Sequence, residues 1–336
     1  MKKINILYIG NNLSTKNNYV TTLEFLTQKL RKENYNVKVT SDKKNKVIRM
    51  LDMCISIYKN RNTTDYILID TYSTLNFYYA FLTSQIARFF NIKYIPILHG
   101  GNLPDRINKS KILSNLIFKN SYKNVAPSKY LKEVFESKNY KVIYIPNTID
   151  ISKYEFKKRS STNPNLLWVR SFKEIYNPIL GLKVFKKLIN NYPYAKLCMV
   201  GPHVDESYRK CKEYVKDNNL SESVIFTGPL SKENWIEKSK NYDIFINTTN
   251  YDNTPISVIE AMALGLTVIS TNVGGMPYLI ANNKDGLLVN KNNVEEMHDA
   301  ILNILKYKNS FAENARIKVE KFSWEVVKNK WIDILN

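Results

Sequence analysis

The sequence has 336 residues, enough for two domains, and its 44% hydrophobic and 12% aromatic residues can bury a sizeable interior, which argues against intrinsic disorder. Three cysteines without a Cys-x-x-Cys pair argue against a disulfide framework or a structural zinc site, and they favour a reducing cytoplasm. The formal net charge is +20, and +14 of it lies before residue 151, where 24 Lys and Arg stand against 10 Asp and Glu. This excess fits either an anionic partner surface or a general richness in lysine, asparagine and isoleucine.

The first apolar run of the chain predicts a β-strand at Ile4–Ile9. Asn11 and Asn12 end this run too early for a signal peptide. No apolar stretch approaches the roughly 20 residues that a transmembrane helix needs. We therefore expect a cytoplasmic protein, whose only contact with a membrane would be peripheral.

Short β-branched runs alternate with amphipathic segments of helical length along the first half of the chain. After Ile4–Ile9, we predict strands at Val37–Val39, Tyr66–Ile69, Tyr94–Ile97, Tyr122–Ala126 and Val142–Ile145, with helices between them such as Tyr19–Lys32 and Tyr72–Phe90. This alternation is typical of a doubly wound parallel sheet.

A polar, charged segment at Ile145–Asn165 contains two prolines and predicts the domain boundary and linker. The alternation then starts again, with predicted strands at Leu166–Val169, Ala195–Val200, Ser223–Thr227, Ile244–Ile246 and Thr267–Ser270. We therefore predict an α/β protein with a Rossmann-like domain at residues 1–150, a second one at 151–320, and a C-terminal helix at 321–336 that packs back toward the first. Two such doubly wound domains leave a cleft where the carboxyl ends of their strands face each other, and ligands bind at those ends.

The most informative stretch is Tyr251–Val289, with the sequence YDNTPISVIEAMALGLTVISTNVGGMPYLIANNKDGLLV. Thr254 suits the N-cap of a helix at Ile256–Leu264, and Pro255 suits its first position, where the missing N–H costs nothing. Such a start presents free backbone N–H groups and the positive end of the helix dipole, which together predict a phosphate site.

Two carboxylates flank this phosphate site. Asp252 lies just before the helix and Glu260 lies about one and a half turns inside it. They can accept hydrogen bonds from hydroxyl groups on either side of a phosphate, which describes a sugar on one side and a ribose on the other. The alternative is a solvated loop aspartate and a structural helix glutamate.

The whole motif closely resembles the donor-binding region of the family 4 retaining glycosyltransferases, the group 1 enzymes of GT-B fold. Five further segments occur in the order that this family shows. They are LHGGNLP around His99, APSKYL at Ala126–Leu131, IPNTID at Ile145–Asp150, WVRSFKEIYNP at Trp168–Pro178 and VIFTGPLSKENW at Val224–Trp235. The resemblance covers much of the chain and implies the GT-B fold, in which two Rossmann-like domains face each other across a cleft.

The resemblance implies a role for each matching residue of the second domain. Glu260 would hold the ribose hydroxyl groups, and Asp252, where the family usually has glutamate, would contact the transferred sugar. Arg170 would bind the diphosphate with its planar fork, and Lys173 is the candidate substitute for the family's Lys-Gly partner, which is missing here. The other donor-binding candidates are the backbone of Asn253, Thr254, Pro255, Ile256 and Ser257, and Gly228 and Leu230 near the base pocket.

In the first domain, the resemblance implies that His99, on the Gly100-Gly101 loop, faces the sugar or the leaving phosphate. Many relatives also have a glycine-rich loop after the first strand. Here only Gly10 remains, followed by Asn11, which tolerates left-handed backbone angles and so still permits a tight turn. Gly10 and Asn11 are therefore donor-binding candidates as well.

The sequence favours catalysis without a metal ion or another cofactor. It contains no Asp-x-Asp motif, with which one large class of such enzymes holds a divalent cation. Arg170, Lys173 and the helix start can instead stabilise charge on a leaving nucleoside diphosphate. The resemblance implies retention of the anomeric configuration, a nucleotide-sugar donor (most commonly a UDP-sugar) and a lipid-linked or glycan acceptor.

Three alternatives remain open. A nucleotide-sugar epimerase can share this fold and would release a changed donor without an acceptor. A non-catalytic sugar-nucleotide-binding protein would keep the site without turnover. A nucleic-acid-binding module would explain the charge, but the aromatic residues show no stacking pattern and no known binding motif occurs, so we expect no nucleic-acid partner.

The segment Val47–Lys59 predicts a helix with a wide apolar face. Val47, Ile48, Leu51, Cys54, Ile55 and Tyr58 share one arc, which Met50, Met53 and Ile57 widen to roughly 220°. Basic residues stand in or beside this face, namely Lys43, Lys44, Lys46, Arg49, Lys59 and Arg61, and Arg106, Lys109 and Lys111 precede a second apolar run at Ile112–Phe118. These features favour an anionic membrane surface as a partner. The alternative is a helix buried on two sides, with lysines that are merely solvated.

Overall fold

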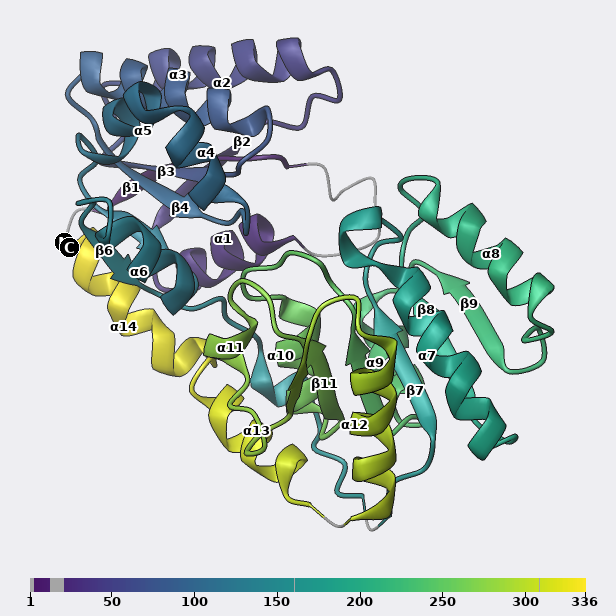
Figure 1. The fold of residues 1–336 in the computed structure, drawn as a ribbon. Coiled ribbons are helices and arrows are strands. Elements are labelled where there is room, and N and C mark those ends of the chain that lie inside the picture. The colour runs from purple at the N-terminus through teal and green to yellow at the C-terminus, as the bar shows by residue number, and fades with distance from the viewer. Residues whose placement is uncertain (1–2, 13–20, 160, 308) are drawn as a thin grey trace. The chain divides into compact units, whose positions relative to one another are not determined.

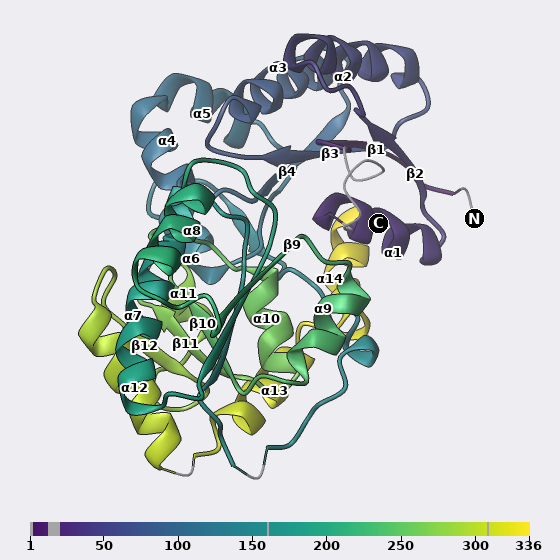
Figure 2. The same cartoon turned by 90° about the vertical axis from the view of Figure 1, so that its right-hand side faces the viewer.

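The computed structural model describes residues 3–12, 21–159, 161–307 and 309–336. These residues form two compact units (Figure 1, Figure 2). Unit 1 extends to Asn147 and includes Val327–Asn336, and unit 2 comprises Thr148–Val326. The boundaries predicted from the sequence are residues 150 and 320. Each unit contains a six-stranded parallel sheet, which confirms the predicted α/β fold with two doubly wound domains.

The sheet of unit 1 has the strand order β2-β1-β3-β4-β5-β6, and every neighbouring pair is parallel. Its strands are β1 (Asn5–Ile9), β2 (Asn36–Thr40), β3 (Tyr66–Thr71), β4 (Lys93–Leu98), β5 (Asn124–Ala126) and β6 (Val142–Tyr144). All residues of β3 are buried, as expected for an apolar strand of a parallel sheet with helices on both faces. The strand order reverses between β1 and β3, and such a reversal opens a crevice at the carboxyl ends of the strands.

Helices cover both faces of this sheet. They are α1 (Thr22–Lys32), α2 (Lys46–Asn60), α3 (Asn76–Phe89), α4 (Leu103–Lys109), α5 (Lys111–Phe118), α6 (Lys129–Glu136) and most of α14 (Trp324–Leu335). Helices α2 and α3 lie together on one face, whereas α1 and α14 lie on the other (Figure 1, Figure 2). Met53 and Ile57 of α2 pack against strand residues such as Leu7 and Ile67 in one buried cluster. This packing uses only one side of α2.

The sheet of unit 2 has the order β12-β11-β10-β7-β8-β9 and is also parallel. Its strands are β7 (Asn165–Val169), β8 (Lys196–Val200), β9 (Val224–Gly228), β10 (Ile244–Asn247), β11 (Thr267–Thr271) and β12 (Leu287–Val289). Counted within the unit from β9, this is the Rossmann order 3-2-1-4-5-6, and the reversal lies between β7 and β10. Strand β12 is not among the strands predicted from the sequence.

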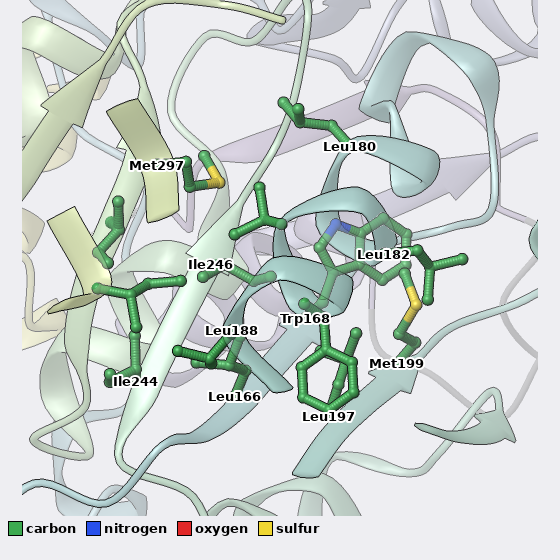
Figure 3. Close-up of a cluster of buried hydrophobic side chains, with 14 of the residues drawn as sticks. Leu166, Trp168, Leu180, Leu182, Leu188, Leu197, Met199, Ile244, Ile246 and Met297 are labelled. Carbon is green, nitrogen blue, oxygen red and sulfur yellow. The ribbon is translucent and has the colours of Figure 1, made fainter. Parts of the chain in front are cut away.

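Two buried clusters lie on the two faces of this second sheet. Leu166 and Trp168 belong to one cluster and Leu167 to the other, because successive side chains of β7 point to opposite faces. The first face is covered by α7 (Pro178–Asn191), α8 (Ser207–Asp217) and α12 (Val294–Lys306), and the second by α9 (Lys232–Ser239), α10 (Ile256–Ala263), α11 (Met276–Leu279) and α13 (Phe311–Glu320). Figure 3 shows Trp168 within the first cluster. Its indole N–H donates to Thr248 Oγ1 at 3.0 Å, so this large side chain leaves no polar atom unsatisfied in the core.

The predicted linker at Ile145–Asn165 is folded against unit 2 over much of its described length. Tyr154 is buried in the second cluster of that unit. Arg159 pairs with Asp243 at 2.8 Å and donates to the carbonyl oxygen of Gly265 at 2.6 Å. From Thr148 on, the described residues of this segment belong to unit 2, and the boundary between the units falls after Asn147, inside the segment.

Candidate functional site

The candidate site of unit 2 lies at the carboxyl edge of its sheet, between β7 and β10. Arg170 directly follows β7, and the loop with Asp252 follows β10. These two strands are neighbours at the point where the strand order reverses, and ligands of open α/β sheets bind in the crevice at such a point. The fold thus brings together two residues that lie 82 positions apart in the sequence.

Arg170 is held at this edge by one ion pair and one aromatic ring. Its Nη2 pairs with Oδ2 of Asp252, and its guanidinium lies 4.1 Å from the ring centroid of Tyr176. Its Nε is buried and has no hydrogen-bond partner in the described parts of the chain. Burial lowers the pKa of Arg170, while the neighbouring Tyr176 opposes that shift. An arginine remains a cation under such conditions, so the site offers a positive charge with an unused N–H donor.

The backbone of the loop that carries Asp252 packs against two adjacent glycines, Gly274 and Gly275. The Gly275 N–H donates to the Asp252 carbonyl oxygen at 3.1 Å. A Cβ atom would lie 2.1 Å from the Asp252 carbonyl oxygen at Gly274, and 1.8 Å from that of Asn253 at Gly275. Only glycine allows such an approach of two backbones. No role is predicted for this glycine pair from the sequence, although the motif VGGMP contains it.

The helix after this loop starts at Ile256, as predicted, but its capping residue differs from the predicted one. Pro255 is the capping residue and α10 begins at Ile256, so the expected N-cap at Thr254 and the expected first helical position at Pro255 are both wrong by one residue. Pro255 has no side-chain capping bond because it has no polar side chain. The amides of Val258 and Ile259 donate to its carbonyl oxygen, while those of the two preceding helix residues have no carbonyl partner in the described ranges. These amides remain available for an anionic ligand.

Ser257 adds a second unused donor at this helix start. Its Oγ is buried and has no hydrogen-bond partner among the described residues. A buried hydroxyl group without a partner costs free energy, which a ligand can recover by accepting its hydrogen bond. The site of unit 2 therefore holds two buried side-chain donors without partners, Ser257 Oγ and Arg170 Nε.

Glu260 lies inside α10 and is almost fully buried. The hydroxyl group of Tyr154 donates to its Oε1 at 2.6 Å, and Nζ of Lys232 forms an ion pair with the same oxygen. Burial and the charge of Glu260 raise the pKa of Tyr154, so its hydroxyl group stays protonated as a donor. Neither Tyr154 nor Lys232 is predicted as a site residue from the sequence. The segment VIFTGPLSKENW includes Lys232, whereas nothing in the sequence indicates Tyr154.

The remaining candidates of unit 2 are less closely connected. Lys173 is exposed and interacts with Asp205, and among the described residues it forms no ion pair with Asp252 or Glu260. Gly228 has a left-handed φ of +70°, and apart from its chain neighbours no described residue has an atom within 4 Å of a Cβ atom placed on it. Leu230 is half-buried against the second cluster. The structure thus places Gly228 at the end of β9 and Leu230 on the turn before α9, and it does not bring Lys173 to the two carboxylates.

In unit 1, His99 follows β4 and forms a polar cluster with residues that the sequence analysis does not name. Its Nε2 lies 2.8 Å from Oδ1 of Asp70, and the hydroxyl group of Tyr8 donates to the same oxygen at 2.9 Å. The ring of Tyr72 stacks on the imidazole at 5.3 Å. Burial and the neighbouring Asp70 raise the pKa of Tyr8, which keeps its hydroxyl group a donor. An acidic residue near the end of the apolar strand YILIDT is the signal that could have indicated Asp70.

The glycine-poor loop after β1 is tied to its own unit. The Gly10 N–H donates to the carbonyl oxygen of Thr40 at 2.8 Å, and a Cβ atom at Gly10 would lie 2.6 Å from Oδ2 of Asp70. Asn11 Oδ1 accepts a hydrogen bond from Arg49 at 3.0 Å, so this side chain already has a structural partner. Gly100 and Gly101 form the turn between His99 and α4. The backbone around Gly10 therefore adjoins the Asp70 cluster, whereas the Asn11 side chain is engaged elsewhere.

No group of three or more His, Cys, Asp or Glu residues is arranged to hold a metal ion in the described ranges. The charged groups at the candidate site of unit 2 instead form two ion pairs, each between one basic and one acidic side chain. Arg170 pairs with Asp252, and Lys232 pairs with Glu260. Each carboxylate of the Asp-x7-Glu motif thus has its own cation.

Two curated relatives illustrate the sequence comparison. An uncharacterized glycosyltransferase of Haemophilus influenzae is 27% identical over 212 residues, which cover 61% of this chain and 57% of that protein. The UDP-Gal:alpha-D-GlcNAc-diphosphoundecaprenol alpha-1,3-galactosyltransferase of Escherichia coli is 26% identical over 200 residues, which cover 53% of this chain and 49% of that protein. The chain therefore spans about half the length of these curated relatives.

The fold and the family follow from two further comparisons. The crystal structure of Anabaena Alr3699/HepE in complex with UDP and glucose superposes with a TM-score of 0.79 at 14% identity, and the match covers 99% of both chains. At that identity the likeness concerns the fold alone, and it agrees with the predicted GT-B fold. Residues 150–319, half of the chain, match the family model of the glycosyl transferases group 1, and they include Arg170, Asp252 and Glu260. The chain belongs to the group 1 glycosyltransferases, as the resemblance of its motifs predicts.

Proposed function

We propose that this chain is a retaining, metal-independent glycosyltransferase that moves a sugar from a nucleotide sugar, with a UDP-sugar as the first choice, to a lipid-linked or glycan acceptor. The observation that carries the proposal is the pair of buried, unpartnered donors at the switch point of unit 2, Arg170 Nε and Ser257 Oγ. A diphosphate accepts hydrogen bonds from both and balances the guanidinium charge. The free amides at the start of α10 add further donors to the same ligand.

The two carboxylates would bind the ribose and the transferred sugar of the donor. Glu260, inside α10, would accept hydrogen bonds from the ribose hydroxyl groups, and Asp252, before α10, would accept one from the transferred sugar. The choice of uridine rests on the UDP named in the HepE complex and in the Escherichia coli relative, and the acceptor class rests on the latter's name. Retention of configuration rests on the resemblance to the family 4 retaining enzymes.

The transfer can proceed with groups of this chain alone. The bond between C1 of the sugar and the β-phosphate oxygen breaks while the oxygen of the acceptor hydroxyl group bonds to C1 from the same side, and the hydroxyl proton passes to the leaving phosphate. Arg170 and the amides at the start of α10 stabilise the negative charge that develops on the diphosphate. A diphosphate leaves without prior protonation, so Asp252 and Glu260 do not act as the acid and base of a glycosidase.

A panel of UDP-, GDP- and ADP-sugars tests this proposal. The true donor at 100 times its Kd should add about 2.7 kcal/mol to the free energy of unfolding. Release of the nucleoside diphosphate should require a lipid-linked sugar or a glycan, and it should continue in EDTA. Conversion of the donor without an acceptor would indicate an epimerase, and stabilisation without turnover would indicate a binding protein. Loss of transfer in EDTA with recovery in Mg²⁺ or Mn²⁺ would contradict the metal-independent mechanism.

The surface of α2 supports an anionic membrane as the place where unit 1 meets a lipid-linked acceptor. Within the described ranges no helix is both long and apolar enough to cross a membrane. Met53 and Ile57 pack into the core of unit 1, while five apolar side chains of α2 are 49–62% exposed. These five are Val47, Ile48, Leu51, Ile55 and Tyr58. The wide apolar face is thus divided into a buried stripe and an exposed stripe, and the exposed stripe with Lys43, Lys44 and Lys46 suits interfacial binding.

Two parts of the predicted membrane surface are wrong. Arg49 is buried, and its guanidinium donates to the carbonyl oxygens of Lys43 and Lys44 and to Asn11, so it is a structural residue. In the second apolar run, Ile117 and Phe118 belong to the core, and only Ile112 is largely exposed. The surface that remains is the exposed stripe of α2 with Lys43, Lys44 and Lys46 at the start of the helix.

Sedimentation with liposomes tests the membrane contact. Binding should require anionic lipid, fall with added salt, and drop when Lys43, Lys44 and Lys46 become Glu, because each basic residue near such a surface adds about 1 kcal/mol. The double variant Leu51→Ser and Ile55→Ser should also weaken binding, because it removes apolar side chains that would enter the membrane surface. The matched control changes three other exposed lysines of unit 1, Lys119, Lys138 and Lys141, to Glu. Equal recovery in the supernatant with neutral and anionic vesicles at low salt would contradict the membrane contact.

A further inference from the structure

We propose that Tyr154 and Lys232 are positioning residues that hold the carboxylate of Glu260 in one orientation. Its Oε2 then accepts hydrogen bonds from the ribose hydroxyl groups of the nucleotide. The inference rests on the proposed function and names two residues that fix the recognition of ribose. Both donors bind the same oxygen, Oε1, and no described residue donates to Oε2. A carboxylate whose two oxygens differ in this way presents a single acceptor to a ligand.

Tyr154 is the rigid partner of this arrangement. Its ring is buried in the second cluster of unit 2, and its carbonyl oxygen accepts a hydrogen bond from Arg316 at 2.6 Å. Ring and backbone are therefore both fixed, and the hydroxyl group reaches Oε1 at 2.6 Å. The raised pKa of Tyr154, which comes from burial first and from the charge of Glu260 second, keeps the proton on the hydroxyl group. Tyr154 thus sets the position of Oε1 from inside the core.

Lys232 is the partner at the solvent edge. Its side chain is 31% exposed, whereas that of Glu260 is 4% exposed, so the lysine covers the carboxylate from outside. It is the first residue of α9, which Ser231 caps by accepting a hydrogen bond from the Asn234 amide at 3.2 Å. A lysine in the first turn of a helix faces the positive end of the dipole, so the pairing with Glu260 offsets an unfavourable placement.

The pairing also has an electrostatic consequence for a nucleoside diphosphate. A buried carboxylate without a counterion would repel the phosphates of a ligand bound beside it. Lys232 neutralises Glu260, so the carboxylate can accept hydroxyl hydrogen bonds without adding net negative charge to the site. Both effects, orientation and neutralisation, act through Glu260 and concern binding more than chemistry.

The test compares binding of UDP and 2′-deoxy-UDP by calorimetry in wild type, Tyr154→Phe and Lys232→Met. We expect wild type to prefer UDP by about tenfold, the discrimination that follows from one hydrogen bond to a charged group. Each variant should bind UDP about five- to tenfold more weakly and lose most of that preference, with kcat near the wild-type value. Lys232→Arg, which keeps the cation, should restore both the affinity and the preference.

Matched controls separate positioning from a general loss of structure. Tyr242→Phe removes another buried tyrosine hydroxyl group from the same cluster, and Lys318→Met breaks the pair with Asp285, whose side-chain exposures of 28% and 3% match those of Lys232 and Glu260. Neither should change the preference for UDP. In a Glu260→Ala background, Tyr154→Phe and Lys232→Met should have no further effect on UDP binding.

The outcomes distinguish this inference from the function on which it rests. Variants that bind UDP and 2′-deoxy-UDP in the wild-type ratio would overturn the positioning role and leave the proposed donor site intact. Equal losses in the wild-type and Glu260→Ala backgrounds would show that the two residues act directly and not through Glu260. A wild-type protein that binds no nucleoside diphosphate would overturn the proposed function, and the inference would fall with it.

Discussion

Replacing Arg170 with glutamine should lower kcat by about 100- to 1,000-fold, the loss that follows when one preorganised donor to a developing negative charge is removed. Arg170 is the guanidinium at the switch point of unit 2, held between Asp252 and the ring of Tyr176. Its Nε has no partner among the described residues, so it can donate to a phosphate oxygen. Steady-state release of UDP in the presence of donor and acceptor measures the effect.

Two further variants separate the loss of this charge from the loss of a buried ion pair, which is destabilising in itself. Arg159→Gln removes another buried arginine of unit 2, whose partner Asp243 is no candidate site residue, so Tm should fall while kcat stays near wild type. Arg170→Lys keeps the charge but loses the planar fork, so its kcat should lie between wild type and Arg170→Gln. If Arg170→Gln turned over at the wild-type rate with an unchanged Tm, the assigned role would be wrong.

Much of the fold could be predicted because both sheets are parallel and covered on both faces. Strands of such sheets form short continuous apolar runs, and β3, with its sequence YILIDT, is buried throughout. Other parts of the structure depend on tertiary contacts. The segment Ile145–Asn165 has the polar composition of a linker, yet Arg159 and Asp243, which lie 84 positions apart, pair and fix it to unit 2. Composition alone does not reveal a partner so distant in the sequence.

The candidate site was predictable in its local parts and not in its contacts. The spacing of Asp252 and Glu260 around a helix start is local, so the sequence shows it. The ion pairs between Arg170 and Asp252 and between Lys232 and Glu260 span 82 and 28 positions, and the bond from Tyr154 to Glu260 spans 106. Which cation pairs with which carboxylate depends on the tertiary packing of strands and helices. For the same reason Lys173, close to Arg170 in sequence, is not the cation that meets the second carboxylate.

The membrane prediction illustrates a limit of helical periodicity. A wide apolar arc on α2 fits either a helix buried on two sides or a helix with one exposed stripe. Exposure of Leu51 and Ile55 beside burial of Met53 and Ile57 selects the second arrangement within unit 1. The same periodicity cannot show that Arg49 turns back to cap the carbonyl oxygens before the helix. The number of basic residues along a helix therefore does not show which of them are exposed; the structure is needed for that.

Glu260→Ala and Asp252→Ala should separate nucleotide binding from turnover. Glu260→Ala should raise the Kd for UDP by about 10- to 100-fold, because hydrogen bonds to a charged carboxylate are worth about 1.5–3 kcal/mol. The loss should appear with UDP alone, since the ribose is part of both the donor and the product. The donor KM should rise along with this Kd.

Asp252→Ala should lower kcat while UDP binds as well as to wild type, or more tightly. The reason is the ion pair seen here: Asp252 competes with phosphate for Arg170, and its removal leaves the guanidinium free for the diphosphate. The carboxylate is needed only for the sugar, which UDP lacks. Asp252→Asn, which keeps an acceptor for the Asn253 amide, controls for a disturbed loop, and Tm controls for the uncompensated charge on Arg170. Calorimetry with UDP that gave equal losses for the alanine variants of Asp252 and Glu260 would contradict the division of roles between the two carboxylates.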